Sequence, residues 1–132
     1  MNGESGEQAD PRINRRINRR IDDILHRIER VSIAERQLVA ADAANDSETG
    51  DTALDAILYD LVVIGEAVRT LPDELTRSEP DIPWQDVVDM RNFLAHEYHR
   101  VSTDVVRRTI DAPLDDLRAA CIRIQERSAP HA

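Results

Sequence analysis

The stretch ALDAILYDLVVIGEAV, residues 53–68, is apolar on nearly every side of the helix that its residues favour. Polar side chains interrupt it only at Asp55, Tyr59, Asp60 and Glu66. A helix that is apolar all round must be covered by other elements on all sides. We therefore expect it to be the central helix of an all-α fold. Because a small monomeric bundle can hardly cover every side, the stretch also favours a homodimer.

The preceding segment has the periodicity of a long amphipathic helix. Asp10 and Pro11 suit its N-cap and first position, and the helix is expected to reach about residue 40. Its apolar residues recur at three- and four-residue spacing: Ile13, Ile17, Ile21, Ile24, Leu25, Ile28 and Val31. The small, polar and acidic residues 42–52 predict a loop that ends in a cap near Asp51 or Thr52.

The following segments predict three more helical pieces. Residues 71–83, with three prolines, favour one short helical turn between two connections. A long helix should begin near Pro83 and use the apolar side chains of Trp84, Val87, Val88, Phe93 and Leu94. Residues 102–127 predict a last helical region that Pro113 kinks or restarts, with a buried stripe of Leu114, Leu117, Cys121 and Ile124. The sequence thus predicts an up-and-down bundle of four long helices plus a short one.

The length of 132 residues favours one helical domain over residues 11–128, with a flexible tail at 1–10 and a C-terminal tail at 129–132. Cys121 is the only cysteine, which excludes an intrachain disulfide and fits a reducing compartment. No apolar run approaches the roughly 20 residues of a membrane span, and residues 1–10 lack the apolar part of a signal peptide. We expect a soluble, cytoplasmic protein without membrane contact.

Charge is distributed unevenly along the chain. The net charge of -9 argues against a general nucleic-acid coat protein. Residues 11–40, however, carry eight arginines against four acidic residues, whereas residues 42–90 carry two against thirteen. Five arginines in and beside INRRINRR lie on the solvent side of the first helix: Arg12, Arg15, Arg16, Arg19 and Arg20. They form either a solvated face or a contact surface for RNA or an acidic partner.

The segment MRNFLAHEYHR, residues 90–100, carries the residues best suited to chemistry. The guanidinium of Arg91 matches phosphate oxygens, and His96 can take and give a proton near neutral pH. Together they suffice for RNA cleavage without a metal ion. Residues five apart on a helix point about 140° apart, so such a site needs a two-fold dimer. From the pattern alone, a surface arginine and a half-buried histidine without function are the alternative.

Several short sequence motifs, in a fixed order, then point to a family. IGEA (64–67), IPW (82–84) and MRN followed by HEY, within approximately residues 53–118, resemble the HepT-like branch of the HEPN family. Members are toxin ribonucleases paired with minimal nucleotidyltransferase antitoxins. The resemblance implies that Arg91 and His96 are the catalytic Arg-x4-His pair of a dimeric, metal-independent endoribonuclease acting on tRNA or mRNA. It also implies that Asn92 is the polar residue that follows the catalytic arginine in the family, and that the antitoxin adenylylates Tyr98 with ATP.

Other residues depart from the family pattern or leave alternatives open. His99 stands where an aromatic or apolar residue is expected, and with His96 it lacks a third metal ligand, so no metal or cofactor is predicted. Glu66 either orients Arg91, reaches solvent, or pairs with Arg69 three residues later. His26 and His131 have no evident partners. The acidic balance favours an alternative function, a non-catalytic HEPN subunit that binds or regulates a nucleotidyltransferase.

Overall fold

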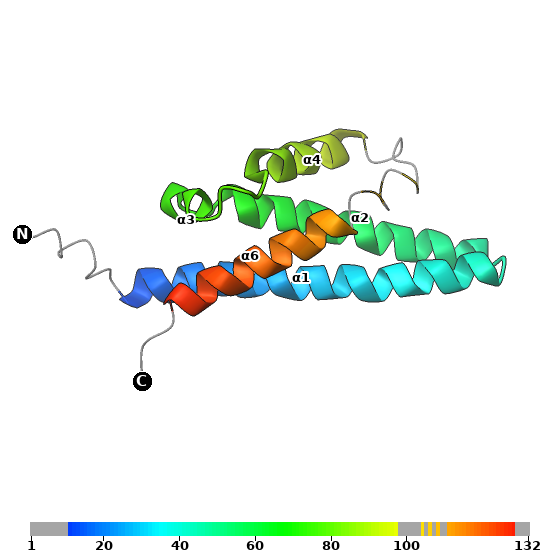
Figure 1. Ribbon diagram of the computed structural model, residues 1–132. Coiled ribbons are helices and arrows are strands. Elements are labelled where there is room, and N and C mark those ends of the chain that lie inside the picture. Colours follow the sequence, from blue (N-terminus) through cyan, green and yellow to red (C-terminus); the bar gives the residue numbers. More distant parts are fainter. Residues whose placement is uncertain (1–10, 98–103, 105, 107, 109–110, 129–132) are drawn as a thin grey trace, which may run out of the picture.

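The computed structural model describes residues 11–97, 104, 106, 108 and 111–128, and the secondary structure within them is helical. The elements, labelled as in Figure 1, are α1 (Pro11–Ala43), α2 (Ser47–Arg69), α3 (Asp73–Arg77), α4 (Trp84–Glu97) and α6 (Ala112–Ser128). Over these ranges the chain has four long helices and a short one. The predicted all-α fold is therefore confirmed, and α1 begins at Pro11 as expected.

The connection between α1 and α2 is shorter than the sequence suggested. The chain turns within residues 44–46, so the prediction of a loop over residues 42–52 was wrong. Asn45 has a φ of 55°, a left-handed conformation that asparagine tolerates better than most residues. The carboxylate of Asp46 accepts a hydrogen bond of 3.1 Å from the backbone N–H of Thr49. This cap satisfies a donor of the first turn, so α2 begins at Ser47, four residues before Asp51 and five before Thr52, where the cap was expected.

The helix α2 occupies the centre of the fold. It runs antiparallel to α1, packs against α4 on another side, and lies behind α6, which crosses α1 (Figure 1). Its side chains of Ile57, Leu58, Leu61 and Ile64 are buried, as its apolar sequence predicted. Tyr59, which is 60% exposed, marks a side of α2 that the described helices leave open.

The core is aliphatic and extends through α6. Its most deeply buried apolar side chains include Ile21, Ile24, Ile57, Ile64, Leu117 and Ile124. The predicted stripe on α6 is confirmed, since all four of its members are buried. A bend at Asp111 precedes α6, and Pro113 is the second residue of that helix, so the proline restarts the helix. Burial and the charge of Glu79 raise the pKa of Cys121 to about 12, which keeps its thiol protonated within the core.

One buried carboxylate joins α1 to α2. Asp60 is only 1% exposed and accepts a hydrogen bond of 2.9 Å from Nη1 of Arg27. Nε of Arg30 lies 3.8 Å from its other oxygen. The guanidinium of Arg27 also lies over the ring of Tyr59, 5.4 Å from its centroid. These contacts offset the cost of burying Asp60 and leave Arg27 with a structural role.

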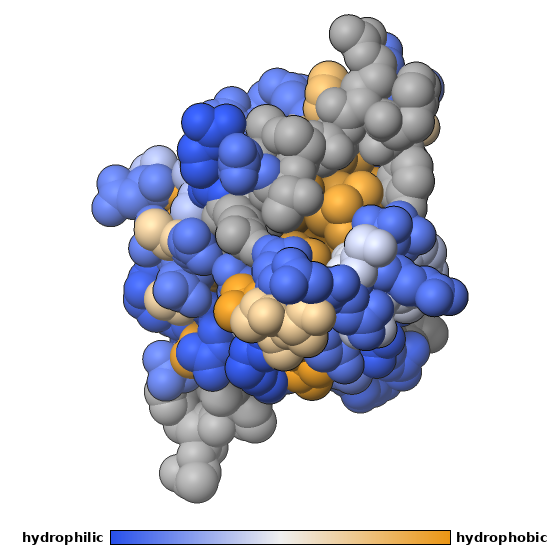
Figure 2. All heavy atoms as spheres, turned by 90° about the vertical axis from the view of Figure 1, so that its right-hand side faces the viewer, coloured by the Kyte–Doolittle hydropathy of each residue, from blue (hydrophilic) through white to orange (hydrophobic). Residues whose placement is uncertain are grey.

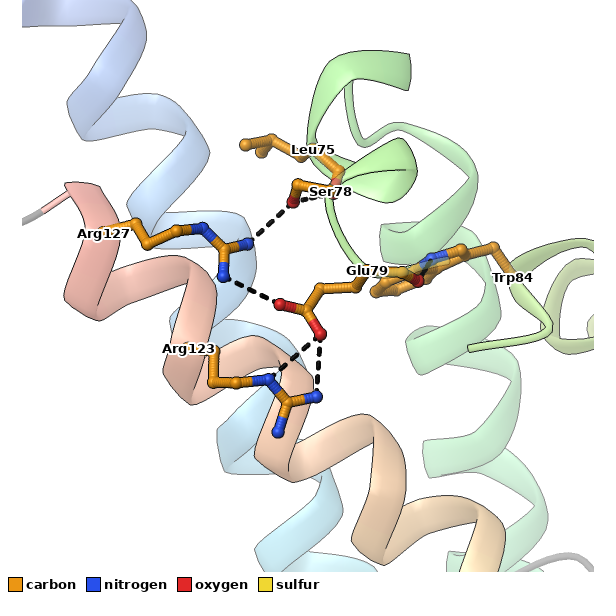
Figure 3. A network of polar contacts seen from close by, with 6 residues as sticks. All are labelled: Leu75, Ser78, Glu79, Trp84, Arg123 and Arg127. Carbon is orange, nitrogen blue, oxygen red and sulfur yellow. Dashed lines mark hydrogen bonds and ion pairs between the residues drawn. The ribbon is translucent and has the colours of Figure 1, made fainter. Parts of the chain in front are cut away.

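A second carboxylate ties α6 to the connection between α3 and α4 (Figure 3). Glu79, 8% exposed, accepts hydrogen bonds of 3.0 and 2.7 Å from Arg123 and one of 2.8 Å from Arg127. The backbone carbonyl of Glu79 accepts a further bond of 3.0 Å from the indole of Trp84, the first residue of α4. The network therefore fixes the start of α4 relative to the C-terminal helix.

Apolar side chains also reach the surface. On α4, Leu94 is buried and Trp84, Val87 and Val88 pack against the core, but Phe93 is 49% exposed. Phe93 is thus less buried than these other apolar residues of α4, because its neighbour Leu94 occupies the inward position. Figure 2 shows hydrophobic side chains reaching the surface among hydrophilic ones at one end of the molecule. Within the described residues, none of the helices is long and apolar enough to cross a membrane.

Candidate active site

Arg91 lies close to the backbone of α2 because a glycine faces it. A Cβ atom at Gly65 would overlap Cβ of Arg91, and would lie 2.9 Å from its Cγ and 3.2 Å from the carbonyl oxygen of Val87. Any larger residue at this position would force α4 away from α2. Gly65 therefore sets the position of Arg91, whose side chain remains 31% exposed.

Glu66 lies next to Gly65 and interacts with two arginines in different ways. Its carboxylate accepts hydrogen bonds from Nε of Arg69, at 3.2 Å, and from Nη2 of the same residue. Nε of Arg91 lies 3.5 Å from Oε2 of Glu66, and within the described part of the chain it has no hydrogen-bond partner. The bond from Arg69 is the main reason that the pKa of Glu66 lies below its ordinary value, and Arg91 adds a smaller effect. Glu66 is thus hydrogen-bonded to Arg69 and is an electrostatic neighbour of Arg91.

Asn92 and His96, on the same helix, are both exposed. Oδ1 of Asn92 accepts a hydrogen bond of 2.9 Å from Nη1 of Arg91, which orients one edge of the guanidinium. His96 lies in the last turn of α4, a position about 140° around the helix axis from Arg91. The structure therefore brings Arg91 together with Asn92 and Glu66, and it leaves His96 facing away from Arg91.

The remaining sequence candidates have a different status. Tyr98, the expected modification site, and His99 lie outside the described residues, as do residues 1–10 and 129–132. Within the ranges that the structure describes, no three His, Cys, Asp or Glu side chains are arranged to hold a metal ion. The predicted site residues that the structure describes are therefore Arg91, Asn92, Glu66 and His96.

A pocket of about 490 Å³ opens beside Arg91, between α1, α2 and α4. Its apolar lining comes from α2: Val62, Val63 and Ala67. Glu66 and Thr70 also line it from α2. Arg91 is the contribution of α4. The volume lies within the range of about 300–1,000 Å³ that is usual for small-molecule sites.

The sequence did not indicate that α1 contributes to this pocket. Arg20, Asp23, His26 and Arg27 all line it. Nη1 of Arg20 donates a hydrogen bond of 2.9 Å to the carbonyl oxygen of Thr70 at the end of α2. Arg20 is half-buried, whereas Arg15, Arg16 and Arg19 are exposed. The available signal was the spacing of positions 20, 23 and 27, which places them on one face of a helix.

The fold and the site define a class of all-helical proteins with an arginine and a histidine five residues apart on a helix beside a basic pocket. A model of the family Ribonuclease HepT-like matches residues 19–124, and this chain belongs to that family, within the HEPN superfamily. The resemblance seen in the sequence is thereby confirmed.

Relatives carry names of the same kind. A protein of Thermococcus cleftensis named "Probable ribonuclease HepT" is 30% identical over 98 residues, which cover 74% of this chain and 86% of that protein. A "Putative RNase" of Caldanaerobacter subterraneus subsp. tengcongensis is 36% identical over 62 residues, covering 47% of this chain and 55% of the relative. No solved structure matches the chain significantly.

Proposed function

We propose that this chain is a toxin-type endoribonuclease that cleaves RNA without a metal ion, with Arg91 and His96 as its catalytic pair. Its family and the names of its relatives support ribonuclease activity. The observation that carries most weight is the position of Arg91: Gly65 holds its side chain beside a basic pocket, and His96 reaches solvent on the same helix.

In the proposed reaction His96 accepts the proton of a ribose 2′-hydroxyl, and the 2′-oxygen attacks the adjacent phosphorus. The bond from phosphorus to the 5′-oxygen breaks, and His96 of the second chain in a homodimer gives a proton to that oxygen. The products are a 2′,3′-cyclic phosphate and a 5′-hydroxyl. Arg91 stabilises the negative charge that accumulates on the pentavalent phosphate, and Asn92 orients its guanidinium.

We place this reaction in a homodimer, because Arg91 and His96 point to different sides of α4. Two-fold pairing of α4 helices provides two arginines and two histidines for one groove, so that one His96 accepts a proton while the other donates one. Phe93 lies between Arg91 and His96 in the sequence and is half-exposed, so it offers apolar surface for such a contact.

We further propose that a partner nucleotidyltransferase neutralises the enzyme by adenylylating Tyr98. This part rests on the family resemblance and on the place of Tyr98 two residues after His96 in the sequence. A nucleotide on that side chain brings negative charge and bulk to the arginine that RNA needs.

The first test measures cleavage of several RNA classes in excess EDTA by full-length protein whose intact mass shows no modification. Wild type should cleave, and Arg91→Ala and His96→Ala should each lower kcat/KM by at least about 100-fold. Arg118→Ala, at an exposed position on α6, is the matched control and should retain full activity. Arg91→Lys should stay impaired, because a lysine cannot present the planar fork.

Cleavage that survives in both catalytic variants would refute these residue assignments. If the folded, unmodified protein cleaves none of the RNAs, the non-catalytic subunit of a nucleotidyltransferase complex becomes the better function. The net charge of -9, unusual for a protein that binds a polyanion, already favours that alternative.

A further inference from the structure

The pocket beside Arg91 has a chemistry that cleavage alone does not require. Its α2 side carries the apolar side chains of Val62, Val63 and Ala67 beside Glu66 and Thr70, and its α1 side is polar. An apolar surface next to hydrogen-bonding groups suits a flat base that has left its stack. The volume of about 490 Å³ exceeds the needs of a phosphate group alone. The pocket is therefore large enough for a nucleotide.

The charged groups around the pocket are not equally available to a ligand. Arg27 is engaged by Asp60 and Tyr59, and Glu66 accepts hydrogen bonds from Arg69. Arg20 uses Nη1 for the carbonyl of Thr70, which leaves its remaining donors for other acceptors. Three arginines and two carboxylates line the pocket, a local excess of positive charge on an acidic protein. An anionic ligand is favoured here over the rest of the surface.

The same face of α1 continues beyond the pocket as a basic strip. Arg16 lies four positions before Arg20, and Arg19 lies four positions before Asp23. Residues four apart share a helix face, so both arginines extend the polar side of the pocket toward the start of α1. Both are exposed. An RNA strand that leaves the pocket along α1 would bring its phosphates close to these guanidinium groups.

We propose that the pocket holds one unstacked nucleotide of a single-stranded RNA segment, next to the phosphate at Arg91, and that Arg16, Arg19 and Arg20 bind the phosphates of neighbouring nucleotides. Asp23 accepts a hydrogen bond from an exocyclic amino group, which favours adenine, cytosine or guanine over uracil. This site rests on the proposed ribonuclease function, and it gives the basic face of α1 a role in substrate binding.

The test is fluorescence anisotropy of full-length protein with short 2′-O-methyl oligoribonucleotides, which cannot be cleaved because they lack the attacking hydroxyl. Oligoadenylate should bind more tightly than oligouridylate. Two variants probe the two parts of the site: Arg16→Ala with Arg19→Ala for the strip, and Ala67→Phe to fill the pocket. Each should weaken oligoadenylate binding by at least about tenfold.

A matched control removes two arginines elsewhere. Arg36→Ala with Arg118→Ala deletes the same charge from exposed positions of α1 and α6 outside the pocket, and should leave affinity nearly unchanged. The strip variant should also reduce the slope of log affinity against log salt by about 1.4, corresponding to two phosphates of a single strand. Circular dichroism shows whether Ala67→Phe has folded, and the strip variant tests the site independently of it.

The site would be overturned by wild-type affinity in the strip variant and the folded Ala67→Phe protein, or by displacement of RNA by inorganic polyphosphate as effectively as by oligoadenylate. Displacement by an acidic peptide at similar concentration would instead assign the face to a protein partner, and would also overturn the site. Cleavage of unmodified RNA separates this inference from the nuclease. Pocket-dependent binding without any cleavage would refute only the proposed ribonuclease function. Normal cleavage by both variants would refute only the nucleotide site.

Discussion

At the scale of single residues, Gly65 controls the position of the candidate catalytic arginine. We predict that Gly65→Ala lowers kcat/KM for RNA by at least about tenfold, because a displacement of roughly 1 Å at a catalytic group is costly. The overlap with Arg91 should also destabilise the fold by about 1–3 kcal/mol. Cleavage kinetics and thermal unfolding of the same preparation measure the two effects.

Gly50 provides the matched control on the same helix. A Cβ there would meet Cβ of Ala41 at 3.6 Å and Cδ1 of Leu38 at 3.7 Å, both ordinary contacts. Gly50→Ala should therefore stabilise the protein by about 0.5–1 kcal/mol, since alanine is the better helix former. Equal stability and equal activity for both alanine variants would show that Gly65 does not set the position of Arg91.

At the scale of elements, Glu79 couples the start of α4 to α6. Hydrogen bonds from Arg123 and then Arg127 hold the pKa of Glu79 below its ordinary value of 4.5. Folding is therefore stabilised by the ionised carboxylate above about pH 4.5, and this contribution is lost as the pH falls through the lowered folded value. We predict that Glu79→Gln destabilises the protein by about 1–3 kcal/mol at pH 7.

Chemical denaturation from pH 7 down to pH 3 tests this coupling. The stability difference between wild type and Glu79→Gln should shrink as the pH falls below 4.5, because the wild-type carboxyl then takes up its proton. Glu126→Gln, an exposed position on α6, should follow the wild-type curve. A difference that stays constant over the whole range would argue against an ionised Glu79 as the link between the elements.

At the scale of the whole molecule, the proposed groove depends on pairing of two chains. We predict a particle of twice the 14.9 kDa chain mass in sedimentation equilibrium at micromolar concentration. Phe93→Glu should raise the dimer dissociation constant at least about tenfold, since burying an aromatic ring contributes about 1.5–3 kcal/mol. Cleavage should fall with the dimer population.

Val39→Glu controls for the change in charge and exposure. Val39 is 54% exposed on α1, comparable with Phe93 at 49% on α4. Its substitution should leave the dimer intact. A monomer that still cleaves RNA would refute the pairing of α4 helices in the mechanism. Equal weakening of the dimer by both variants would refute it as well.

Across these scales, helical periodicity predicted most of the fold. The spacing of Ile21, Ile24 and Ile28 placed the buried side of α1, and Pro11 and Pro113 marked the starts of α1 and α6. The early start of α2 was missed because it depends on the backbone conformation of Asn45 and on the Asp46 cap. Such local geometry competes with the polar composition of the segment, which alone suggested a longer loop.

The candidate site divides in the same way. The order of residues by itself determined that Arg91 and His96 lie on one helix and that Glu66 lies on an apolar one, because these relations follow from spacing along the chain. Only the tertiary structure decided that Gly65 receives Arg91, that Nε of Arg91 lies near Glu66, and that Arg20, Asp23 and His26 line the pocket. The physical reason is that periodicity fixes which face a side chain occupies, whereas packing between helices fixes which face it meets.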